Sequence, residues 1–379
     1  MGRADPRPLR VYVRDHAARA GATNRGEGLA GGRPIGAVRS ARGRVIAGVL
    51  FTCSQSSSKV RLLFLLLLTN IARVNKPNEV IMTSLTNLPP IARLSSKVIR
   101  ILGCNPGPMT LQGTNTYLVG TGRRRVLVDS GEAKTAGDYI KLLDSVLNEE
   151  NATIEHLVVT HWHHDHIGGV EPVRNLLRRL FPTEKQPIVW KLPRSPNDTN
   201  SSDDEKSIQW KPLKNDQVVE VEGAKLQIKY TPGHTSDHAC LLLQDENILF
   251  SGDCILGEST TVFEDLHDYM LSLNKILELR PKIIYPGHGP VLNDPLPHIQ
   301  YYIKHRQQRE ENILQMLQQQ GNDKSMTEMD IVKLIYKDTP EKLWLAAAFT
   351  VGHHLRKLEK EGKVLQEEEG GWRRIRGKM

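Results

Sequence analysis

From about Val98 onward, short runs of apolar residues are separated by turns rich in Gly, Pro and Asn, a pattern typical of β-strands. Strands are predicted over residues 98–102, 116–119, 125–128, 157–160, 188–190, 225–230, 241–243, 248–250 and 283–285. Apolar positions at helical spacing predict helices over residues 136–147, 170–180 and 265–278. Strands joined mainly as hairpins, with helices between some of them, predict an α+β domain over residues 82–294.

The pattern becomes helical in the last part of the chain. The predicted elements are helices over residues 299–320, 329–337 and 340 to about 362, then strands over residues 364–366 and 372–375. Thr327 is placed to cap the second helix, and Pro340 suits the first turn of the third. Three helices followed by a hairpin predict a winged-helix-like domain over residues 295–379.

Residues 1–81 show no sustained helical or strand period and carry most of the positive charge. They contain 14 Lys and Arg against 4 Asp and Glu, a net charge of +10. The rest of the chain holds 37 basic against 39 acidic residues, a net charge of −2. The basic character therefore belongs to this leader and gives no argument that the folded part binds nucleic acid.

An Arg-rich, acid-poor leader is compatible with a mitochondrial transit peptide, so the mitochondrial matrix is the expected location and the cytoplasm the alternative. The leader is otherwise expected to be disordered, or untranslated with Met82 as the first residue. Its one apolar stretch, residues 62–72, is shorter than the roughly 20 residues of a membrane-spanning helix. No membrane partner is expected.

Four cysteines lie far apart in the sequence and form no C-x-x-C pair. They are Cys53, Cys104, Cys240 and Cys254. This spacing excludes a disulfide framework and a thiolate zinc site, and it suits a reducing compartment.

Residues 160–166 read Thr-His-Trp-His-His-Asp-His and follow the apolar run 157–159. Three imidazoles and a carboxylate within six residues, at the end of a buried strand, have no packing role there. Buried without partners they would destabilise the fold by several kcal/mol, whereas a bound cation would hold them together. The heptapeptide therefore predicts a metal site.

Four more motifs follow apolar strands in the same way: Asp129-Ser130-Gly131, Pro232-Gly233-His234, Gly252-Asp253 and Pro286-Gly287-His288-Gly289. Strand ends gathered at one edge would bring these side chains to a common point. The candidate metal ligands are His161, His163, Asp165, His166, His234, Asp253 and His288. Seven nitrogen and oxygen ligands suit two catalytic zinc ions per chain, with Mn or Fe as alternatives, each with three terminal ligands and one shared carboxylate.

The motifs THxHxDH, PGH, GD and PGHG, in this order, resemble the metallo-β-lactamase superfamily of binuclear hydrolases. The resemblance covers the chain from about Ser96 onward and implies an αββα sandwich followed by the winged-helix-like domain. It implies one zinc on His161, His163 and His234, and another on Asp165, His166 and His288. Asp253 would bridge the two ions, and Asp165 and Asp253 would be the catalytic carboxylates. Asp129 would orient a ligand histidine through a hydrogen bond.

A narrower resemblance lies in residues 103–117, 252–257, 261–266 and 268–270. These segments are similar to an animal branch of the superfamily, mitochondrial endoribonucleases acting on single-stranded RNA. The resemblance implies an RNA substrate. Substrate contacts are expected from Asn115 or Tyr269, with a packing role as the alternative for Tyr269. A metal-bridging hydroxide that attacks phosphorus would leave 3′-hydroxyl and 5′-phosphate ends.

Two other functions stay open at this point. The same metal site hydrolyses thioesters in glyoxalase II, and fungal carrier-protein thioesterases also resemble residues 263–270. A winged helix often binds nucleic acid, but residues 295–379 carry only three more basic than acidic residues, and 367–369 are acidic. A domain that packs on the hydrolase is therefore expected. The sequence does not determine an oligomeric state, and a monomer is expected.

Overall fold

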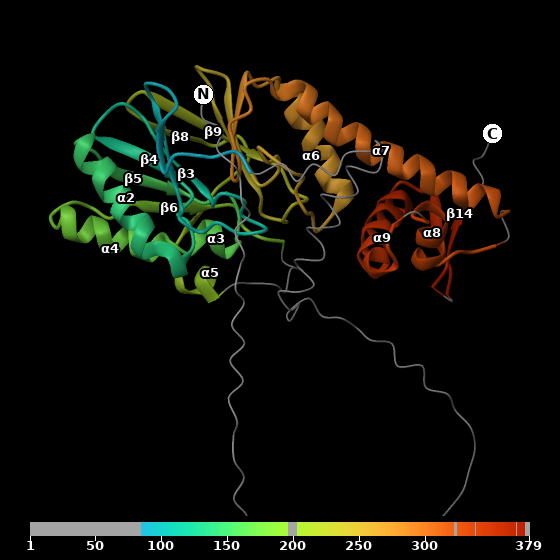
Figure 1. Cartoon of the computed structure of the whole chain (residues 1–379). Coiled ribbons are helices and arrows are strands. Elements are labelled where there is room, and N and C mark those ends of the chain that lie inside the picture. Colours follow the sequence, from blue (N-terminus) through green and yellow to red (C-terminus); the bar gives the residue numbers. More distant parts are fainter. Residues whose placement is uncertain (1–84, 196–202, 322–323, 338, 369, 376–379) are drawn as a thin grey trace, which may run out of the picture. The chain divides into compact units, whose positions relative to one another are not determined.

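The chain is described by a computed structural model that covers residues 85–195, 203–321, 324–337, 339–368 and 370–375 (Figure 1). The leader predicted over residues 1–81 lies outside the described residues. Among the described residues, no helix is long and apolar enough to span a membrane.

The first sheet combines antiparallel and parallel strands in sequence order. Its strands are β1 (Ile91–Arg93), β2 (Val98–Leu102), β3 (Asn115–Val119), β4 (Arg124–Val128), β5 (Thr153–Val158), β6 (Ile188–Lys191) and β7 (Lys211–Pro212). The pairs from β1 to β4 are antiparallel, and those from β4 to β7 are parallel. Parallel neighbours need long crossovers, provided here by helices α2 (Ala136–Glu149), α4 (Val170–Leu180) and α5 (Asp203–Ser207). The helices predicted over residues 136–147 and 170–180 provide two of these crossovers, and the antiparallel neighbours in this sheet are the strands from β1 to β4.

The second sheet is mainly antiparallel, with the order β12-β11-β10-β9-β8. Its strands are β8 (Val218–Val221), β9 (Ala224–Tyr230), β10 (Ala239–Leu243), β11 (Ile248–Gly252) and β12 (Ile283–Pro286). Only β11 and β12 are parallel, and α6 (Leu266–Leu279) forms the crossover between them.

Three apolar cores define four layers. Alternate residues of β3 and β4, such as Tyr117 and Val126, pack against Leu226 and Phe250 of the second sheet. The opposite face of the first sheet packs on α2 and α4, and that of the second sheet packs on α6 and α7 (Pro295–Gln319). The chain therefore has the αββα sandwich that was expected (Figure 1).

The C-terminal region has its own core and a winged-helix order of elements. After α7 come α8 (Glu328–Ile335), the short helix η2 (Glu341–Leu343), α9 (Trp344–Lys360), β13 (Val364–Gln366) and β14 (Trp372–Arg374). Thr327 caps α8 in a reciprocal capping box with Asp330. Strands β13 and β14 pair antiparallel to form the wing.

Helix α7 belongs to two cores. Ile299 and Tyr302 in its first half pack in the hydrolase core beneath the second sheet. Ile313 and Leu317 in its second half pack in the winged-helix core. The predicted boundary at residue 295 coincides with the start of α7, but the helix itself is shared by the two folds.

Candidate metal centre

The candidate ligands lie on loops at the ends of strands from both sheets. Strand β5 ends at Val158, two residues before the predicted end, because the Thr160 backbone N–H donates to Asp129 Oδ1 (2.8 Å) and not to a neighbouring strand. The chain then turns into the short helix α3 (His164–Ile167), which carries Asp165 and His166.

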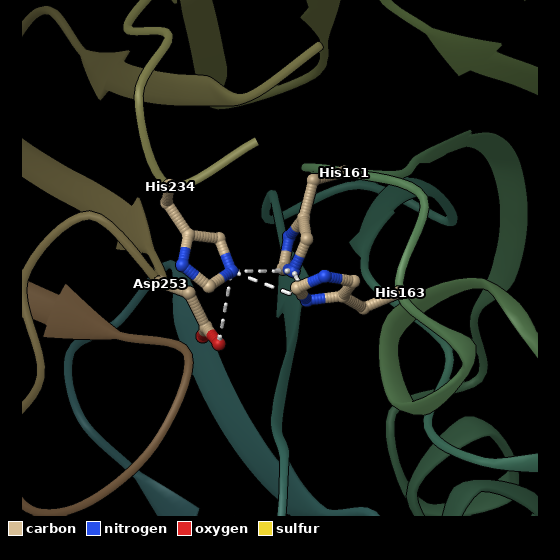
Figure 2. A group of neighbouring side chains, drawn as sticks. All are labelled: His161, His163, His234 and Asp253. Atoms are coloured by element: carbon tan, nitrogen blue, oxygen red, sulfur yellow. Dashed lines mark hydrogen bonds and ion pairs between the residues drawn. The ribbon is translucent and has the colours of Figure 1, made fainter. Parts of the chain in front are cut away.

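One group of ligand atoms consists of three imidazole nitrogens (Figure 2). His161 Nε2 lies 2.9 Å from His163 Nδ1, and His234 Nε2 lies 3.2 Å from both. Three ring nitrogens facing one another at these distances cannot all be satisfied by hydrogen bonds among themselves.

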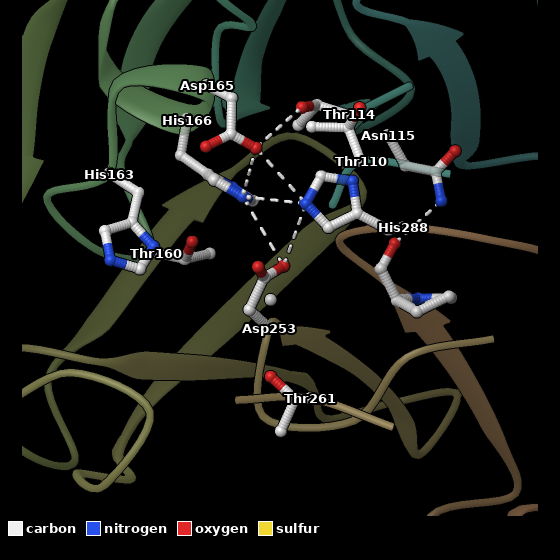
Figure 3. A network of polar contacts seen from close by, with 12 residues as sticks. Thr110, Thr114, Asn115, Thr160, His163, Asp165, His166, Asp253, Thr261 and His288 are labelled. Atoms are coloured by element: carbon white, nitrogen blue, oxygen red, sulfur yellow. Dashed lines mark hydrogen bonds and ion pairs between the residues drawn. The ribbon is translucent and has the colours of Figure 1, made fainter. Parts of the chain in front are cut away.

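A second group joins two imidazoles and a carboxylate (Figure 3). His166 Nε2 and His288 Nε2 are 3.3 Å apart, and Asp165 Oδ2 lies 3.3 Å from the first and 3.2 Å from the second. All three residues are buried.

Asp253 lies between the two groups. Its Oδ2 is 3.7 Å from His234 Nε2 of the first group. Its Oδ1 is 3.4 Å from His166 Nε2 and 3.3 Å from His288 Nε2 of the second. One carboxylate therefore offers an oxygen to each group, which is the geometry of a bridging ligand.

The donor atoms fit tetrahedrally coordinated metal ions. Ligand atoms at 2.0–2.1 Å from a tetrahedral zinc lie about 3.3 Å from one another. The separations within both groups, 2.9–3.2 Å and 3.2–3.3 Å, are close to this value. The seven residues could therefore hold two cations, and their nitrogen and oxygen donors suit zinc, manganese or iron.

Hydrogen bonds fix which nitrogen most of the histidines present to the centre. His166 Nδ1–H donates to Asp129 Oδ2 (2.8 Å), and His234 Nδ1–H donates to the Val262 carbonyl (2.7 Å). His288 Nδ1–H donates to the Gly113 carbonyl (3.3 Å), and His161 Nδ1–H to Thr160 Oγ1 (3.0 Å). In all four the Nε2 lone pair is left for a metal. His163 instead directs Nδ1 inward.

The two groups differ electrostatically. Burial lowers the pKa of His161 and His163 well below the usual value, and that of His234 to about 4, so these imidazoles are neutral. Burial also opposes a charge on His288, but Asp253 and Asp165 raise the pKa of His288 to about 10. The histidines of the first group are thus already in the deprotonated state that binds a metal. In the second group, the positive charge of His288 is neutralised by the carboxylates of Asp165 and Asp253.

The structure buries the side chains of both Asn115 and Tyr269. Asn115 is buried, and its Nδ2 donates to the carbonyls of Pro286 and Gly289, 2.9 Å in each case. Tyr269 is fully buried, and its hydroxyl donates to the Cys254 carbonyl (2.8 Å). The structure therefore gives both side chains a packing role in place of the predicted substrate contacts. The two hydrogen bonds from Asn115 stabilise the loop that carries His288.

Two residues of the centre were missed by the sequence analysis. Thr114 Oγ1 donates to Asp165 Oδ2 (3.2 Å). His238 Nε2 accepts from the Asp253 backbone N–H (3.1 Å), while Thr231 Oγ1 lies 3.0 Å from its Nδ1. Thr114 lies within residues 103–117, the segment that carries the narrower resemblance, but nothing there singled it out. The only signal for His238 was that it lies four residues after His234.

Known proteins match both parts of the chain. Residues 109–288 match the metallo-beta-lactamase superfamily, and residues 327–372 match the beta-lactamase associated winged helix domain. A Drosophila melanogaster protein named beta-lactamase-like protein 2 homolog is 50% identical over 73% of this chain and 92% of its own length.

Other matches are more distant. An Aspergillus fumigatus protein named atrochrysone carboxyl ACP thioesterase is 38% identical, over 68% of this chain and 79% of its own. The crystal structure of a beta-lactamase domain protein from Burkholderia ambifaria shares the fold, with a TM-score of 0.61, at 19% identity. That likeness covers 76% of this chain and 95% of the other.

Proposed function

This chain belongs to the metallo-beta-lactamase superfamily of hydrolases, and on that basis we propose that it is a dizinc endoribonuclease acting on single-stranded RNA. The observation that carries the proposal is the position of Asp253 between two sets of ligand atoms. Two adjacent cations sharing a carboxylate suit the hydrolysis of phosphodiesters.

Each of the two groups of ligand side chains would hold one metal ion. His161, His163 and His234 would hold one zinc, and Asp165, His166 and His288 the other. Once bound, the two ions would activate a water molecule and neutralise charge on the phosphoryl oxygens. Asp129 and the Val262 carbonyl keep the rings of His166 and His234 in one orientation, so the site is preorganised.

The proposed reaction predicts the ends of its products. Water supplies the oxygen that joins phosphorus, the bond from phosphorus to the 3′ oxygen breaks, and that oxygen leaves with a proton. The products carry 3′-hydroxyl and 5′-phosphate ends. A cyclic phosphate would instead require the ribose 2′-hydroxyl as nucleophile and would contradict the mechanism.

Thioester hydrolysis is the second candidate. One relative at 38% identity is named a carboxyl ACP thioesterase. The same ligand set can direct water to an acyl carbon. The RNA proposal rests on the resemblance of residues 103–117 and 252–257 to animal endoribonucleases, because residues 263–270 resemble the fungal thioesterases as well.

Two further properties are proposed with the activity. The Arg-rich leader would direct the chain to the mitochondrial matrix, and the chain would act as a monomer. Protease protection of the full chain in isolated mitochondria tests the first, and light scattering of the purified protein tests the second. A protease-sensitive chain outside the organelle, or a dimer, would contradict them.

The deciding experiment compares the full-length protein with its Asp253→Ala variant in the presence of zinc. One substrate is end-labelled single-stranded RNA, and an acyl thioester is tested in parallel. We expect the wild type to cut the RNA and the variant to leave it whole, with two zinc ions per wild-type chain by elemental analysis. Intact RNA with rapid loss of thioester would reject the nuclease proposal in favour of the second candidate.

A further inference from the structure

Thr114 directly precedes strand β3 and lies fully buried beside Asp165 (Figure 3). Its hydroxyl oxygen Oγ1 is 3.2 Å from Asp165 Oδ2. The same Asp165 oxygen faces the ring nitrogens of His166 and His288, at 3.3 and 3.2 Å. Thr114 therefore contacts the carboxylate oxygen that Asp165 presents to the second metal position.

The Asn105 side chain holds Thr114 through two hydrogen bonds. The Thr114 backbone N–H donates to Asn105 Oδ1 (2.8 Å), and Asn105 Nδ2 donates to Thr114 Oγ1 (3.0 Å). Because a backbone N–H can only donate, the first bond fixes which end of the amide is oxygen. Since Oγ1 accepts from Asn105, its own proton is left for the Asp165 carboxylate, which can only accept. We call Asn105 and Thr114, joined in this way, the Asn105–Thr114 relay.

Two glycines leave room for the Asn105 amide. A methyl group at Gly103 would lie 3.0 Å from Asn105 Oδ1, and one at Gly113 would lie 3.2 Å from the same oxygen. Gly113 also has a φ of +120°, which residues with a side chain rarely adopt. Asn105 is 5% exposed, and its backbone carbonyl accepts from Thr110 Oγ1 (2.6 Å). The buried amide is therefore held in a single orientation.

The segment that contains the relay, residues 105–114, also orients a second ligand of the same group. The Gly113 carbonyl accepts the hydrogen bond from His288 Nδ1 (3.3 Å). In the first group, His234 donates instead to the Val262 carbonyl, far along the chain. A change in the relay should therefore affect the second metal position and leave the first one intact.

We propose that Asn105 is a positioning residue for the second metal ion and acts through the Thr114 hydroxyl on Asp165. The inference rests on the two-metal centre proposed above and not on the identity of the substrate. Without the hydrogen bond from Thr114, the Asp165 carboxylate can rotate about its Cβ–Cγ bond, and the second metal position loses a fixed oxygen ligand. The relay thus sets the affinity for the second ion.

The first test compares zinc binding by the full-length chain and by its Thr114→Val variant, which keeps the branched shape and removes the hydroxyl. We expect the dissociation constant of the second zinc to rise about 10- to 100-fold, the usual effect of losing a group that orients a metal ligand. The constant of the first zinc should not change. Competition with a zinc chelator measures both constants. Thr114→Ser keeps the hydroxyl and should bind both ions as the wild type does.

Thr116→Val is the matched control. Thr116 lies two residues further along the chain and is equally buried, but its hydroxyl donates to the Ile101 carbonyl (2.9 Å). It also accepts from the Tyr139 hydroxyl (3.0 Å), so this variant is expected to lose stability and yet keep two zinc ions. Circular dichroism establishes that each variant is folded before its zinc is measured.

Asn105→Asp separates the relay from simple charge attraction, and it tests the relay even if Thr114→Val does not fold. The carboxylate can still accept from the Thr114 N–H, but it cannot donate to Oγ1, so the hydroxyl proton turns away from Asp165. An added negative charge alone would tighten cation binding. Loss of the relay should instead weaken binding of the second zinc by about 10-fold or more. Tighter binding in Asn105→Asp would overturn the proposal.

Combined variants show which ion is lost and whether Asn105 acts through Thr114. At a zinc concentration where Thr114→Val holds one ion, adding His161→Ala should remove that ion, whereas adding His288→Ala should not. Adding Asn105→Ala to Thr114→Val should cause no further loss of affinity, because the relay is already broken. Fully additive effects would mean that Asn105 acts by another route, and the relay would be rejected.

Activity at several zinc concentrations separates this proposal from the endoribonuclease function. Hydrolysis of bis(p-nitrophenyl) phosphate by Thr114→Val should be low at limiting zinc and recover in excess zinc, which a misfolded variant would not do. If the wild type binds only one zinc, the two-metal centre and the relay both fail. If Thr114→Val and Asn105→Asp hold the second zinc as tightly as the wild type, the relay alone is wrong. If the zinc results are as expected but RNA stays intact, the relay stands and the RNA substrate is rejected.

Discussion

Asp253 has one carboxylate oxygen near each group of ligands, so its orientation decides whether the two groups act as one centre. Its backbone is held by His238, whose Nε2 accepts the Asp253 N–H. Thr231 Oγ1 donates to Cys240 Sγ and so accepts from His238 Nδ1, which leaves His238 Nε2 without a proton. His238 is therefore a positioning residue and not a further ligand.

Replacing His238 with Phe is expected to weaken zinc binding by about 10- to 100-fold, as is usual when a group that orients a metal ligand is lost. Competition with a zinc chelator measures the change. His238→Gln, whose amide can still accept the hydrogen bond, should lose less. The control is His156→Phe, at a partly buried histidine that accepts from Trp190. Zinc affinity unchanged in His238→Phe would contradict the positioning role.

Gly287 leaves room for the Asp253 carboxylate. A methyl group there would lie 2.4 Å from Asp253 Oδ1 and 3.0 Å from the Gly252 backbone, which is too close for either. Gly287→Ala is therefore expected to displace Asp253 and lower kcat/KM by about 100-fold, the effect of misplacing a reacting group by about 1 Å.

Gly137→Ala is the matched control, because a methyl group at that position on α2 meets nothing within 4 Å. It should keep full activity and melt at the same temperature or slightly higher. Full activity of Gly287→Ala would show that the bridging position tolerates the displacement.

The candidate ligands could be named from the sequence because they sit in compact motifs after apolar runs. Thr114 and His238 could not, since their contacts with Asp165 and Asp253 join segments 51 and 15 residues apart, and a local pattern does not report such contacts. Asn115 and Tyr269 lay in segments that resemble the family, but resemblance does not reveal which way a side chain faces. Both proved to be buried.

Among the elements, strands with apolar runs were predictable, including the edge strand β12, whereas the edge strands β1, β7 and β8 were not predicted. Strand β1 has three residues and β7 has two, which is too short to show an alternating pattern. Strand β8 alternates in burial and is followed by a turn at Gly223, so its signal was present and overlooked. The parallel pairing of β4 to β7 depends on the crossover helices, and local patterns cannot show it.

The capping box at the start of α8 gives a prediction at this scale. Thr327 Oγ1 accepts from the Asp330 N–H (3.2 Å), and Asp330 accepts in return from the Thr327 N–H (3.1 Å). Thr327→Ala is expected to destabilise the winged helix by about 1 kcal/mol. Hydrogen exchange of the α8 amides should speed up by about 5-fold, which is that energy expressed as a ratio. Thr327→Ser should leave it unchanged, and equal protection in both variants would contradict the capping role.

For the molecule as a whole, the contact between α9 and the loop of Phe263, where the rings of His353 and Phe263 lie 5.4 Å apart, should respond to pH. Burial, helped by Arg356, lowers the pKa of His353 to about 4. Asp265 opposes the shift, and His354 adds to it. In the unfolded chain His353 has its usual pKa near 6.5, so the unfolded state takes up a proton first as pH falls. His353 therefore reduces stability progressively from about pH 6.5 to pH 4, and has no effect above that window.

We expect the melting temperature of the metal-free protein to fall between pH 7 and pH 4.5, and to fall less in His353→Phe. Scanning calorimetry in a chelating buffer, with both proteins at each pH, measures the difference. His267→Phe serves as the control, since His267 is partly exposed at the start of α6. Parallel curves for wild type and His353→Phe would mean that His353 is protonated in the folded protein.

Because α7 is shared, the hydrolase ends later in the chain than its motifs do. Arg306 of α7 lies over the rings of Phe263, Tyr269 and Tyr302, at 5.6, 4.9 and 5.1 Å. A chain that ends at residue 294 would keep every candidate ligand. It would nevertheless expose to solvent part of the apolar core that α7 covers beneath the second sheet. A chimera that exchanges this winged helix between hydrolases would therefore fold only if the two chains were joined within α7, between Arg306 and Ile313. There the helix passes from one core into the other.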